Sequence, residues 1–571
     1  MRIRIANYIV IFIFLLMAFW LFNLQVIGGT RYRELSDKNC IRLLPQEGSR
    51  GRIFDRRGNI LVDNRLAYDL MILAQGESEI DEIIIKASGI LGKDPQDLKE
   101  KFKGSFAVPF VPVTVAENID LKKALALEEL KTDLSGIVIQ PKPRRTYPFG
   151  KLAAHVIGYL NEIDRWRLTK LADYGYKTKD IVGFGGIEEK YDYYLRQEEG
   201  GASVEVDHQG RFVRLLGFRP PQSGKDIQLT LDLRIQKIIE EILAGRKGCA
   251  IIMDPYTGAI LALVSSPAFN PEIFVKKENY SIVELFGDSA SPLINRAISG
   301  LYPAGSVFKL VVATAALETG KINLNTSFYC PGSMNIGREE FSCWDEHHQQ
   351  NLREAIIHSC NVFFYRTGLL VGPQLIHDYA LKFGLARPTL IDLPYETQGL
   401  VPNPLWRRIY KFKKWFDGDT ANFSVGQGEL LVTPLQISRM MAVFANQGYL
   451  VTPYTVQGIG NRDVSRQQIK IVHLPFKKNN IELIRQGLRS AVSATGGTAH
   501  ILSELPISVA GKTGTAQVTR RQPHGWFTGF FPFKNPKFVI TIFLENGGSG
   551  YNSSVLAKQI IERMIQENIV E

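Results

Sequence analysis

The chain has 571 residues, of which 45% are hydrophobic and 22% are charged. This composition excludes a largely disordered chain, and the length suggests roughly three or four domain-sized units. The formal net charge is +11, but Lys and Arg are spread among acidic residues without a long basic block, which argues against nucleic-acid binding. A mildly basic surface favours contact with anionic lipid or with an anionic wall polymer.

An apolar segment near the N-terminus predicts a membrane anchor. Tyr8–Phe22 is an unbroken apolar run and, continued to Ile27, reaches about the length that spans a bilayer. Arg2 and Arg4 precede it, as expected for a cytoplasmic start, although further arginines follow it. A cleaved signal peptide is the alternative, but no small-x-small cleavage site follows the run. We therefore predict a single-pass anchor over residues 1–28, with the rest of the chain on the far side of the membrane.

Residues 29–223 are predicted to form a β-rich region with short helices. Arg50–Leu61 has the pattern of a strand, a turn and a second strand, with Gly and Asn at the turn. Glu77–Lys103 has Ile and Leu at helical spacing and charges on the other face, which predicts a helix. A stretch rich in Pro and Gly, residues 219–224, marks the expected domain boundary.

Residues 224–571 are predicted to form an α+β domain. Cys249–Met253 and Ala259–Val264 are apolar strands joined by a turn, and Phe538–Phe543 is a late strand. Helical patterns lie between the early and the late strands, and a final helix covers residues 555–565. We expect one antiparallel sheet, flanked by helices, that joins both ends of this region.

Three short polar motifs follow one another in this second region. The first places a serine hydroxyl and a lysine amine at i and i+3, on one face of a helix. A serine is a poor nucleophile unless a base removes its proton, and a desolvated lysine can be that base. Each motif alone is a weak signal, because a lone lysine is often a surface residue and a serine or asparagine often caps a helix. All three motifs in this order are strong evidence. The motifs are Ser306-Val307-Phe308-Lys309, Ser359-Cys360-Asn361 and Lys512-Thr513-Gly514-Thr515.

These motifs are similar to the S-x-x-K, S-x-N and K-T-G signature of penicillin-binding proteins and β-lactamases. The chain as a whole resembles a class B penicillin-binding protein, because its N-terminal half carries further family segments that β-lactamases lack. The elongation type, penicillin-binding protein 2, fits better than the division type, mainly because of a cysteine cluster described below. The segments of the N-terminal half are Arg50–Leu61, Arg145–Pro148 and Gly183–Glu188, and further family blocks near the motifs are Tyr302–Gly305, Gly426–Gly428 and His524–Phe527.

The resemblance implies a role for each residue of the first two motifs. Ser306 would attack the carbonyl between the two terminal D-alanines of a peptidoglycan stem peptide. Lys309 would be the base that takes the serine proton. Ser359 would relay a proton to the leaving amine, and Asn361 would hold the substrate amide.

By the same resemblance, the third motif would bind the terminal carboxylate of the substrate. Lys512 would supply positive potential, and Thr513 and Thr515 would donate hydrogen bonds to the carboxylate. Gly514 would let the strand approach the ligand closely. The backbone N–H groups of Ser306 and Thr515 would form the oxyanion hole.

Three cysteines and one histidine predict a metal site; three of the four lie between the first and second motifs, and Cys360 lies within the second. The set consists of Cys330, Cys343, His347 and Cys360, the ligand types of a closed tetrahedral zinc site, and metal ligands occupy similar places in elongation-type relatives. His348 is an alternative to His347, and a disulfide or free thiols are alternatives to zinc. Zinc here would brace the active site without touching substrate. The other two cysteines, Cys40 and Cys249, are predicted to be separate from this set.

From the resemblance we expect a serine-type peptidoglycan D,D-transpeptidase that cross-links stem peptides during cell elongation and is inhibited by β-lactams. The alternatives are a D,D-carboxypeptidase or β-lactamase-type hydrolase, a division-type class B transpeptidase, and a non-enzymatic β-lactam sensor or scaffold. The expected location is the inner membrane, with the catalytic domain in the periplasm. The resemblance also implies two partners, a membrane glycosyltransferase of the elongation machinery and a scaffold protein, which an elongated pedestal (residues 29–223) would contact.

Overall fold

The computed structural model describes residues 2–33, 41–72, 77–105, 112–130, 134, 136–206, 212–518 and 521–570. The chain forms two compact units. The first comprises Met1–Gly51, Asn64–Arg145 and Arg196–Gly224, and the second comprises Arg52–Asp63, Thr146–Leu195 and Lys225–Glu571. Two segments of the N-terminal half therefore fold with the C-terminal half, in the second unit.

The predicted apolar helix is present at the N-terminus. Helix α1 (Arg2–Phe22) continues into the π-helical turn η1 (Asn23–Ile27). Residues Ile3–Ile27 are long and apolar enough to cross a membrane, and none of the most apolar part is buried inside the protein. A helix of 25 residues is about 37 Å long, which exceeds the ~30 Å hydrocarbon core of a bilayer.

The first unit contains two groups of strands. β1 (Ile41–Gln46), β8 (Gly200–Val206) and β9 (Phe212–Arg219) form one antiparallel sheet in the order β1-β8-β9. β4 (Val113–Ile119) and β5 (Ile137–Thr146) both pair with β3 (Ile60–Ile72). Apolar side chains of this second group pack against the helices α3 (Glu77–Leu91), α4 (Pro95–Ser105) and α5 (Leu121–Glu129).

The single helix predicted over Glu77–Lys103 is in fact two helices. α3 ends at Leu91, and Gly92 follows with a φ of +68° while its N–H donates to the Ser88 carbonyl oxygen at 2.8 Å. Glycine adopts this left-handed conformation at little cost and thereby ends a helix. Pro95 then begins α4, in the first helical turn where proline is tolerated. Apolar spacing did not reveal the break because both helices bury apolar side chains in the same cluster.

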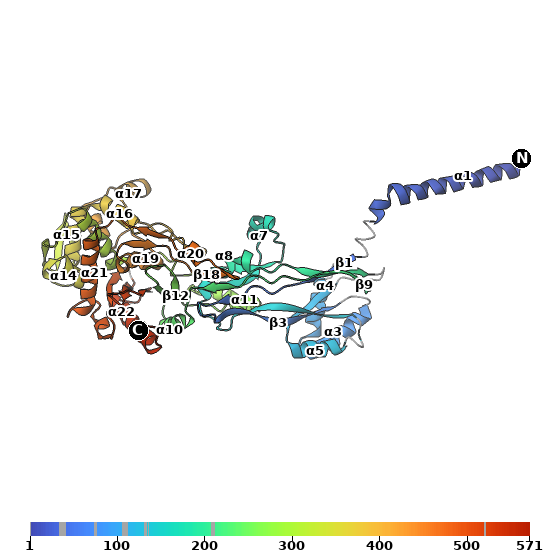
Figure 1. The fold of residues 1–571 in the computed structure, drawn as a ribbon, viewed down its shortest axis with the longest axis horizontal. Coiled ribbons are helices and arrows are strands. Elements are labelled where there is room, and N and C mark those ends of the chain that lie inside the picture. The colour runs from blue at the N-terminus through green and yellow to red at the C-terminus, as the bar shows by residue number, and fades with distance from the viewer. Residues whose placement is uncertain are drawn as a thin grey trace. The chain divides into compact units, whose positions relative to one another are not determined.

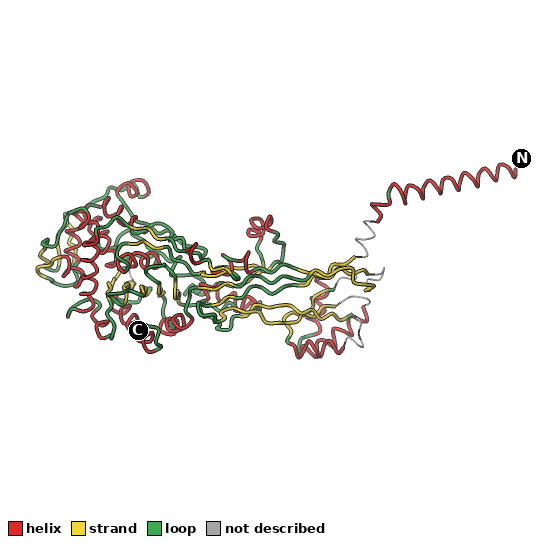
Figure 2. Tube along the Cα trace, in the orientation of Figure 1, coloured by secondary structure: helices red, strands yellow, loops and turns green. Residues whose placement is uncertain are grey.

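The second unit is built on a five-stranded antiparallel sheet in the order β12-β11-β23-β22-β21. The early pair of strands joins the late ones, as predicted for the α+β domain. Alternate residues of β11 belong to two different apolar clusters, so both faces of the sheet are covered. Figure 2 shows strands of this unit enclosed by helices. The strands are β11 (Gly248–Met253), β12 (Ile260–Ser266), β21 (Ala510–Ala516), β22 (His524–Phe531) and β23 (Phe538–Leu544).

Helices of the second unit pack on the two faces of this sheet (Figure 1). One face packs on α10 (Leu233–Leu243) and α22 (Gly550–Gln566), and the other packs on α19 (Pro434–Ala445). The further helices are α12 (Asn279–Gly287), α13 (Lys309–Glu318), α14 (Leu352–Ile357), α15 (Asn361–Val371), α16 (Pro373–Lys382), α17 (Pro404–Tyr410), α18 (Asp417–Ser424) and α21 (Lys478–Ser493). Short helices and 3-10 turns are α6 (Ala154–Ile157), α7 (Arg165–Leu171), η3 (Ala172–Tyr174), α8 (Gly186–Lys190), α9 (Asp192–Leu195), α11 (Glu272–Val275), η4 (Gly305–Phe308), α20 (Ser465–Gln468) and η5 (His500–Glu504).

Smaller strand ladders complete the second unit. β10 (Ile227–Leu229) pairs with β2 (Ile53–Phe54) and with β18 (Val456–Ile459). The segment after the last part of the first unit therefore pairs with a segment that lies between the first two parts of that unit in the sequence. The other pairs are β6 (Tyr159–Glu162) with β7 (Ile181–Phe184), β13 (Ser327–Cys330) with β16 (His348–Asn351), β14 (Ser333–Ile336) with β15 (Glu339–Ser342), β17 (Tyr449–Val451) with β20 (Ile471–His473), and β18 with β19 (Arg462–Asp463).

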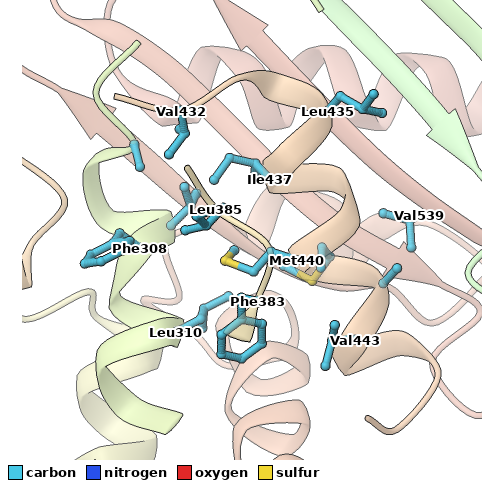
Figure 3. Packing of buried hydrophobic residues seen from close by; sticks show 14 of the residues in the cluster. Phe308, Leu310, Phe383, Leu385, Val432, Leu435, Ile437, Met440, Val443 and Val539 are labelled. Carbon is cyan, nitrogen blue, oxygen red and sulfur yellow. The ribbon is translucent and has the colours of Figure 1, made fainter. Parts of the chain in front are cut away.

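Helix α19 lies in the core that positions the functional site (Figure 3). A capping box between Thr433 and Gln436 begins the helix. Its Met440, together with Val539 of β23 and Phe308 of η4, belongs to one cluster of fully buried side chains. Because Phe308 ends the turn η4, this core holds that turn in place.

Candidate active site

Ser306 lies in the 3-10 turn η4, directly before helix α13. Gly305 precedes it with a φ of +56°, and its N–H donates to the Gly426 carbonyl oxygen at 2.9 Å. A Cβ atom on Gly426 would lie 2.1 Å from the Gly305 carbonyl oxygen, and one on Gly305 would lie 2.9 Å from the Thr515 carbonyl oxygen. Only glycine fits such approaches. The serine turn is therefore held between the loop at Gly426 and strand β21.

Gly514 of β21 faces the same turn. A Cβ atom there would lie 3.1 Å from Cγ1 of Val307 and 3.1 Å from Cβ of Trp526. The glycine of the third motif thus makes room for the serine turn, a packing reason that adds to the close ligand approach expected from the sequence.

Lys309 begins helix α13 and is fully buried. Its Nζ donates to the Ser359 carbonyl oxygen at 2.7 Å, to the Ser359 hydroxyl at 3.3 Å and to Oδ1 of Asn361 at 2.7 Å. Burial lowers the pKa of Lys309 to about 8. In the described part of the chain no hydrogen bond joins Lys309 to the Ser306 hydroxyl. The structure therefore brings the first and second motifs together through the lysine, with the serine one helical turn away.

The second motif lies between helices α14 and α15. Ser359 has a φ of +54°, an uncommon conformation for a residue other than glycine, and it is buried. Cys360 is the N-cap of α15, and its Sγ accepts from the Phe363 N–H at 3.4 Å. Asn361 begins α15, and its Nδ2 donates to the Ser342 carbonyl oxygen at 3.3 Å. The motif thus caps a helix and also contacts the buried lysine.

The third motif occupies β21. Lys512 is fully buried, and its Nζ donates to the Thr513 carbonyl oxygen at 3.2 Å. Burial, with a smaller contribution from the charge of Lys309, lowers the pKa of Lys512 well below its ordinary value. The hydroxyl of Thr515 accepts a hydrogen bond from the Gly550 N–H at 3.0 Å.

Residues of all three motifs line one cleft of about 690 Å³. The lining includes Ser306, Ser359, Asn361, Thr513 and Thr515, whereas both lysines are buried behind it. Other residues that line the cleft were not predicted from the sequence: Glu339, Glu340, Phe341, Ser342, Trp344, Tyr365, Asn422, Gln427 and Tyr551. Of these, only Gln427 could have been found, because it lies inside the Gly426–Gly428 segment that resembles the family.

The four predicted metal ligands come together beside this cleft. One ligand atom from each of Cys330, Cys343, His347 and Cys360 lies within 4.8 Å of the others. The Nδ1 of His347 is 3.4 Å from Sγ of Cys343 and 3.7 Å from Sγ of Cys330. Zinc bound tetrahedrally at ordinary bond lengths would place its nitrogen and sulfur ligands about 3.6 Å apart. The donor set and its spacing therefore fit zinc.

No disulfide joins the cysteines of this cluster, so the alternative of a disulfide among them is wrong. Hydrogen bonds from Cys360 and from backbone N–H groups lower the pKa of the Cys343 thiol, which favours the metal-binding thiolate. His347, rather than the exposed His348, is the clustered imidazole. Cys249 is buried in β11, apart from the cluster, and Cys40 lies outside the described residues.

Comparisons with known proteins agree with this arrangement. Residues 248–566 match the penicillin binding protein transpeptidase domain, and residues 45–229 match the penicillin-binding protein dimerisation domain. The chain is 32% identical over 584 residues to the peptidoglycan D,D-transpeptidase MrdA of Acinetobacter baumannii, an alignment that covers 98% of this chain and 87% of that protein.

Solved structures give the same result. The penicillin-binding protein PBP2 of Helicobacter pylori, in its complex with MreC, superposes with a TM-score of 0.84 at 27% identity and covers 93% of this chain and 99% of that one. A chain of a peptidoglycan synthase complex superposes with a TM-score of 0.74 at 28% identity, covering 98% of each chain. With two family domains matched in order and three motifs around one cleft, the chain belongs to the class B penicillin-binding proteins of the elongation type, the PBP2 group of peptidoglycan D,D-transpeptidases.

Proposed function

We propose that this chain cross-links peptidoglycan stem peptides during cell elongation through an acyl-enzyme on Ser306. The observation that carries the proposal is the meeting of the three motifs at one cleft: Ser306, Ser359, Asn361, Thr513 and Thr515 line it, and both motif lysines are buried behind it. The protein is thus an acyltransferase whose donor is a peptide ending in D-alanyl-D-alanine.

In the first step Ser306 Oγ attacks the carbonyl carbon between the two D-alanines. Lys309 takes the serine proton in its neutral form, which burial makes accessible near neutral pH. When Lys309 loses one proton, its Nζ stops donating one of its hydrogen bonds to Ser359 or Asn361. The lone pair on Nζ can then accept the proton of the Ser306 hydroxyl, which lies one helical turn away. The N–H groups of Ser306 and Thr515 stabilise the oxyanion, and one such donor is commonly worth about 3 kcal/mol.

The third motif recognises the carboxylate of the terminal D-alanine. Thr513 and Thr515 donate hydrogen bonds to it, and Lys512 supplies positive charge from behind the cleft wall. The pKa of Lys512 is lowered by burial and by the like charge of Lys309, so a bound carboxylate would favour the charged form of Lys512.

The acyl-enzyme then passes to an acceptor. Ser359 delivers a proton to the nitrogen of the leaving D-alanine as the C–N bond breaks. An amine of a neighbouring stem peptide attacks the Ser306 ester, forms the cross-link amide and releases the serine hydroxyl. Water in place of the amine would hydrolyse the ester, which is the outcome in carboxypeptidases and β-lactamases.

The test of this function is mass spectrometry after exposure to a β-lactam, combined with a cross-linking assay on stem-peptide substrates. We expect a stable adduct on the peptide that contains Ser306, and dimeric muropeptides as product. Ser306→Ala should abolish both. Rapid release of hydrolysed penicillin, without dimeric product, would contradict the proposal and identify a hydrolase.

We also propose that Cys330, Cys343, His347 and Cys360 hold a structural zinc ion. A closed set of four protein ligands leaves no position for substrate, so the metal would brace the loop before α15 and would not take part in acyl transfer. Support comes from the lack of a disulfide among these cysteines, the spacing of the sulfur and nitrogen atoms, and the lowered pKa of Cys343. Elemental analysis of the purified protein should find one zinc per chain.

Location and partners complete the proposal. Residues 1–28 would anchor the chain in the inner membrane, residues 224–571 would be the catalytic domain in the periplasm, and residues 29–223 would be the interaction domain. The partners would be a membrane glycosyltransferase and a scaffold protein, since similar chains occur in a complex with MreC and in a peptidoglycan synthase complex.

Strand β9 of the first unit offers a test of these partners. Three of its apolar residues are more than half exposed: Val213 (54%), Leu215 (55%) and Phe218 (56%). Exposed apolar side chains on one strand are suited to a contact with another protein. Leu215→Glu with Phe218→Glu should reduce co-purification of the full chain with its polymerase or scaffold, while β-lactam acylation persists. Unchanged co-purification would remove this strand from the interface.

A further inference from the structure

A basic and aromatic segment of the second unit has no part in the chemistry described above. This segment, residues 405–416 (the basic segment), contains helix α17 from Leu405 onward and the loop that follows, and it includes no acidic residue. Its exposed cations, Arg408, Lys411, Lys413 and Lys414, make no ion pair within the described ranges. Unpaired cations at this density repel one another, so folding alone does not explain them.

Large apolar side chains are exposed among these cations. Phe412 is 89% exposed, more than any other large apolar side chain in the described part of the chain, and Tyr410 and Phe416 are 69% and 64% exposed. Phe412 also has a φ of +55°, which is unfavourable for a residue with a bulky side chain. Phe412 thus combines an exposed ring with a costly backbone conformation, and strained residues of this kind are concentrated at functional sites.

The framework of the basic segment is rigid, although its outer side chains are exposed. Asn403 caps α17, with Oδ1 accepting from the Trp406 N–H at 2.7 Å. At the other end Nε1 of Trp415 donates to the Thr420 hydroxyl at 2.8 Å. Arg407 pairs with Asp419 at 2.7 Å. Because both ends are fixed, the cations and rings between them form a preorganised surface rather than a loose loop.

The basic segment leads directly into the wall of the active-site cleft. It is followed by α18, whose Asn422 lines the cleft. Gly418, two residues after the segment, approaches the ring of Phe341, another lining residue, so closely that a Cβ atom would lie 3.0 Å from it. A polymer with one stem peptide in the cleft would therefore have its neighbouring parts near this surface. Figure 1 shows α17 at the margin of its unit.

We propose that the basic segment binds the uncross-linked glycan strand that carries the stem peptides. The four cations would pair with carboxylates of stem peptides adjacent to the one that reacts. The rings of Tyr410, Phe412 and Phe416 would pack against the C–H faces of sugar rings. This assignment rests on the proposed function and deepens it by giving the strand a binding surface outside the catalytic cleft. Anionic lipid is the competing ligand, and the continuity of the segment with the cleft wall favours the glycan.

The test measures binding of soluble, uncross-linked glycan strands with pentapeptide stems to the full-length chain in neutral-lipid nanodiscs. The variant carries Arg408→Gln, Lys411→Gln, Lys413→Gln and Lys414→Gln. A matched control replaces four exposed lysines elsewhere with Gln, so that both variants lose the same charge: Lys477, Lys478, Lys534 and Lys537. We expect the first variant to bind strands about tenfold more weakly at low salt and the control to change by less than about twofold. Phe412→Ser should weaken binding without changing the salt dependence.

Several outcomes would overturn the inference. One is an equal loss of strand binding in the control variant, and another is unchanged strand binding in the first variant. The others are equal binding of amidated and unmodified strands by the unmodified chain, and a loss of binding in the first variant that is seen only with phosphatidylglycerol vesicles. β-Lactam labelling of Ser306 is measured in parallel and should be equal in all these variants, since none of the replaced residues lies in the catalytic machinery. Absence of labelling in the unmodified chain would instead refute the proposed function, independently of strand binding.

Discussion

The backbone N–H of Asn361 donates a hydrogen bond to Sγ of Cys343 at 3.1 Å. The side-chain Oδ1 of the same asparagine accepts from Nζ of Lys309 at 2.7 Å. One residue thus connects the cysteine cluster to the lysine that we propose as the base. A change in the cluster is therefore expected to reach the active site.

The first prediction concerns Cys343→Ser. This variant should lose the zinc ion that we propose and should be acylated by a β-lactam at least about tenfold more slowly, because the start of α15 and Asn361 would no longer be held. Elemental analysis and the acylation rate check the two effects. Cys249→Ala, in a buried strand away from the cluster, is the control and should keep its metal; equal acylation of Cys343→Ser and the unmodified chain would disconnect the cluster from the site.

The second prediction concerns the pH dependence of acylation. The pKa of Lys309 is lowered to about 8 by burial, and only the neutral amine can accept the serine proton. The rate should therefore rise about tenfold per pH unit below that value and level off above it. Stopped-flow measurements with a fluorescent penicillin from about pH 6 to pH 10 would show the profile. Lys309→Met should remove both the profile and nearly all the activity, and a flat profile would exclude Lys309 as the base.

The third prediction concerns Gly426→Ala. The new methyl group would lie 2.1 Å from the Gly305 carbonyl oxygen, and the residue would keep a φ of +75°. We expect displacement of the serine turn and at least about a hundredfold loss of acylation, since an error of about 1 Å at a reacting group has this effect.

A variant at a second glycine distinguishes the effect of backbone strain from the effect of the clash at Gly426. Gly320 has a φ of +68° and nothing within 4 Å of its Cβ position. Gly320→Ala should cost about 1–2 kcal/mol of stability and leave acylation nearly unchanged. Similar activities for the two variants would show that the contact between Gly426 and Gly305 is unimportant.

The fourth prediction concerns stability at acidic pH. His155 is buried, its Nε2 lies 2.7 Å from the Pro292 carbonyl oxygen, and burial lowers its pKa from 6.5 to about 4. The unfolded chain binds this proton more readily, so stability should fall as the pH decreases from about 6.5 to about 4, by roughly 3 kcal/mol in total.

Denaturation of the unmodified chain and of His155→Gln at several pH values would isolate this contribution. The variant should lose less stability on acidification than the unmodified chain. His473→Gln, at an exposed position of β20, should behave like the unmodified chain. Parallel pH curves for all three proteins would show that His155 does not titrate in this range.

The sequence by itself determined the apolar N-terminal helix, the α+β pattern of the second region and the three motifs. These features depend on residue type and short spacing. A serine and a lysine at i and i+3 share a helix face wherever the helix lies, and apolar strands such as Cys249–Met253 predict a buried sheet without reference to their neighbours. The cysteine and histidine set was predicted from residue type and spacing together with the resemblance to elongation-type relatives.

Only the tertiary structure decided which distant groups meet. Lys309 contacts Ser359 and Asn361 because α13 and α15 belong to one apolar core, and Gly426 contacts Gly305 because two loops converge there. The return of Arg52–Asp63 and Thr146–Leu195 to the second unit likewise depends on pairing between segments far apart in the chain. Such contacts follow from the shape complementarity of packed side chains over long sequence separations, which local patterns of residues do not encode.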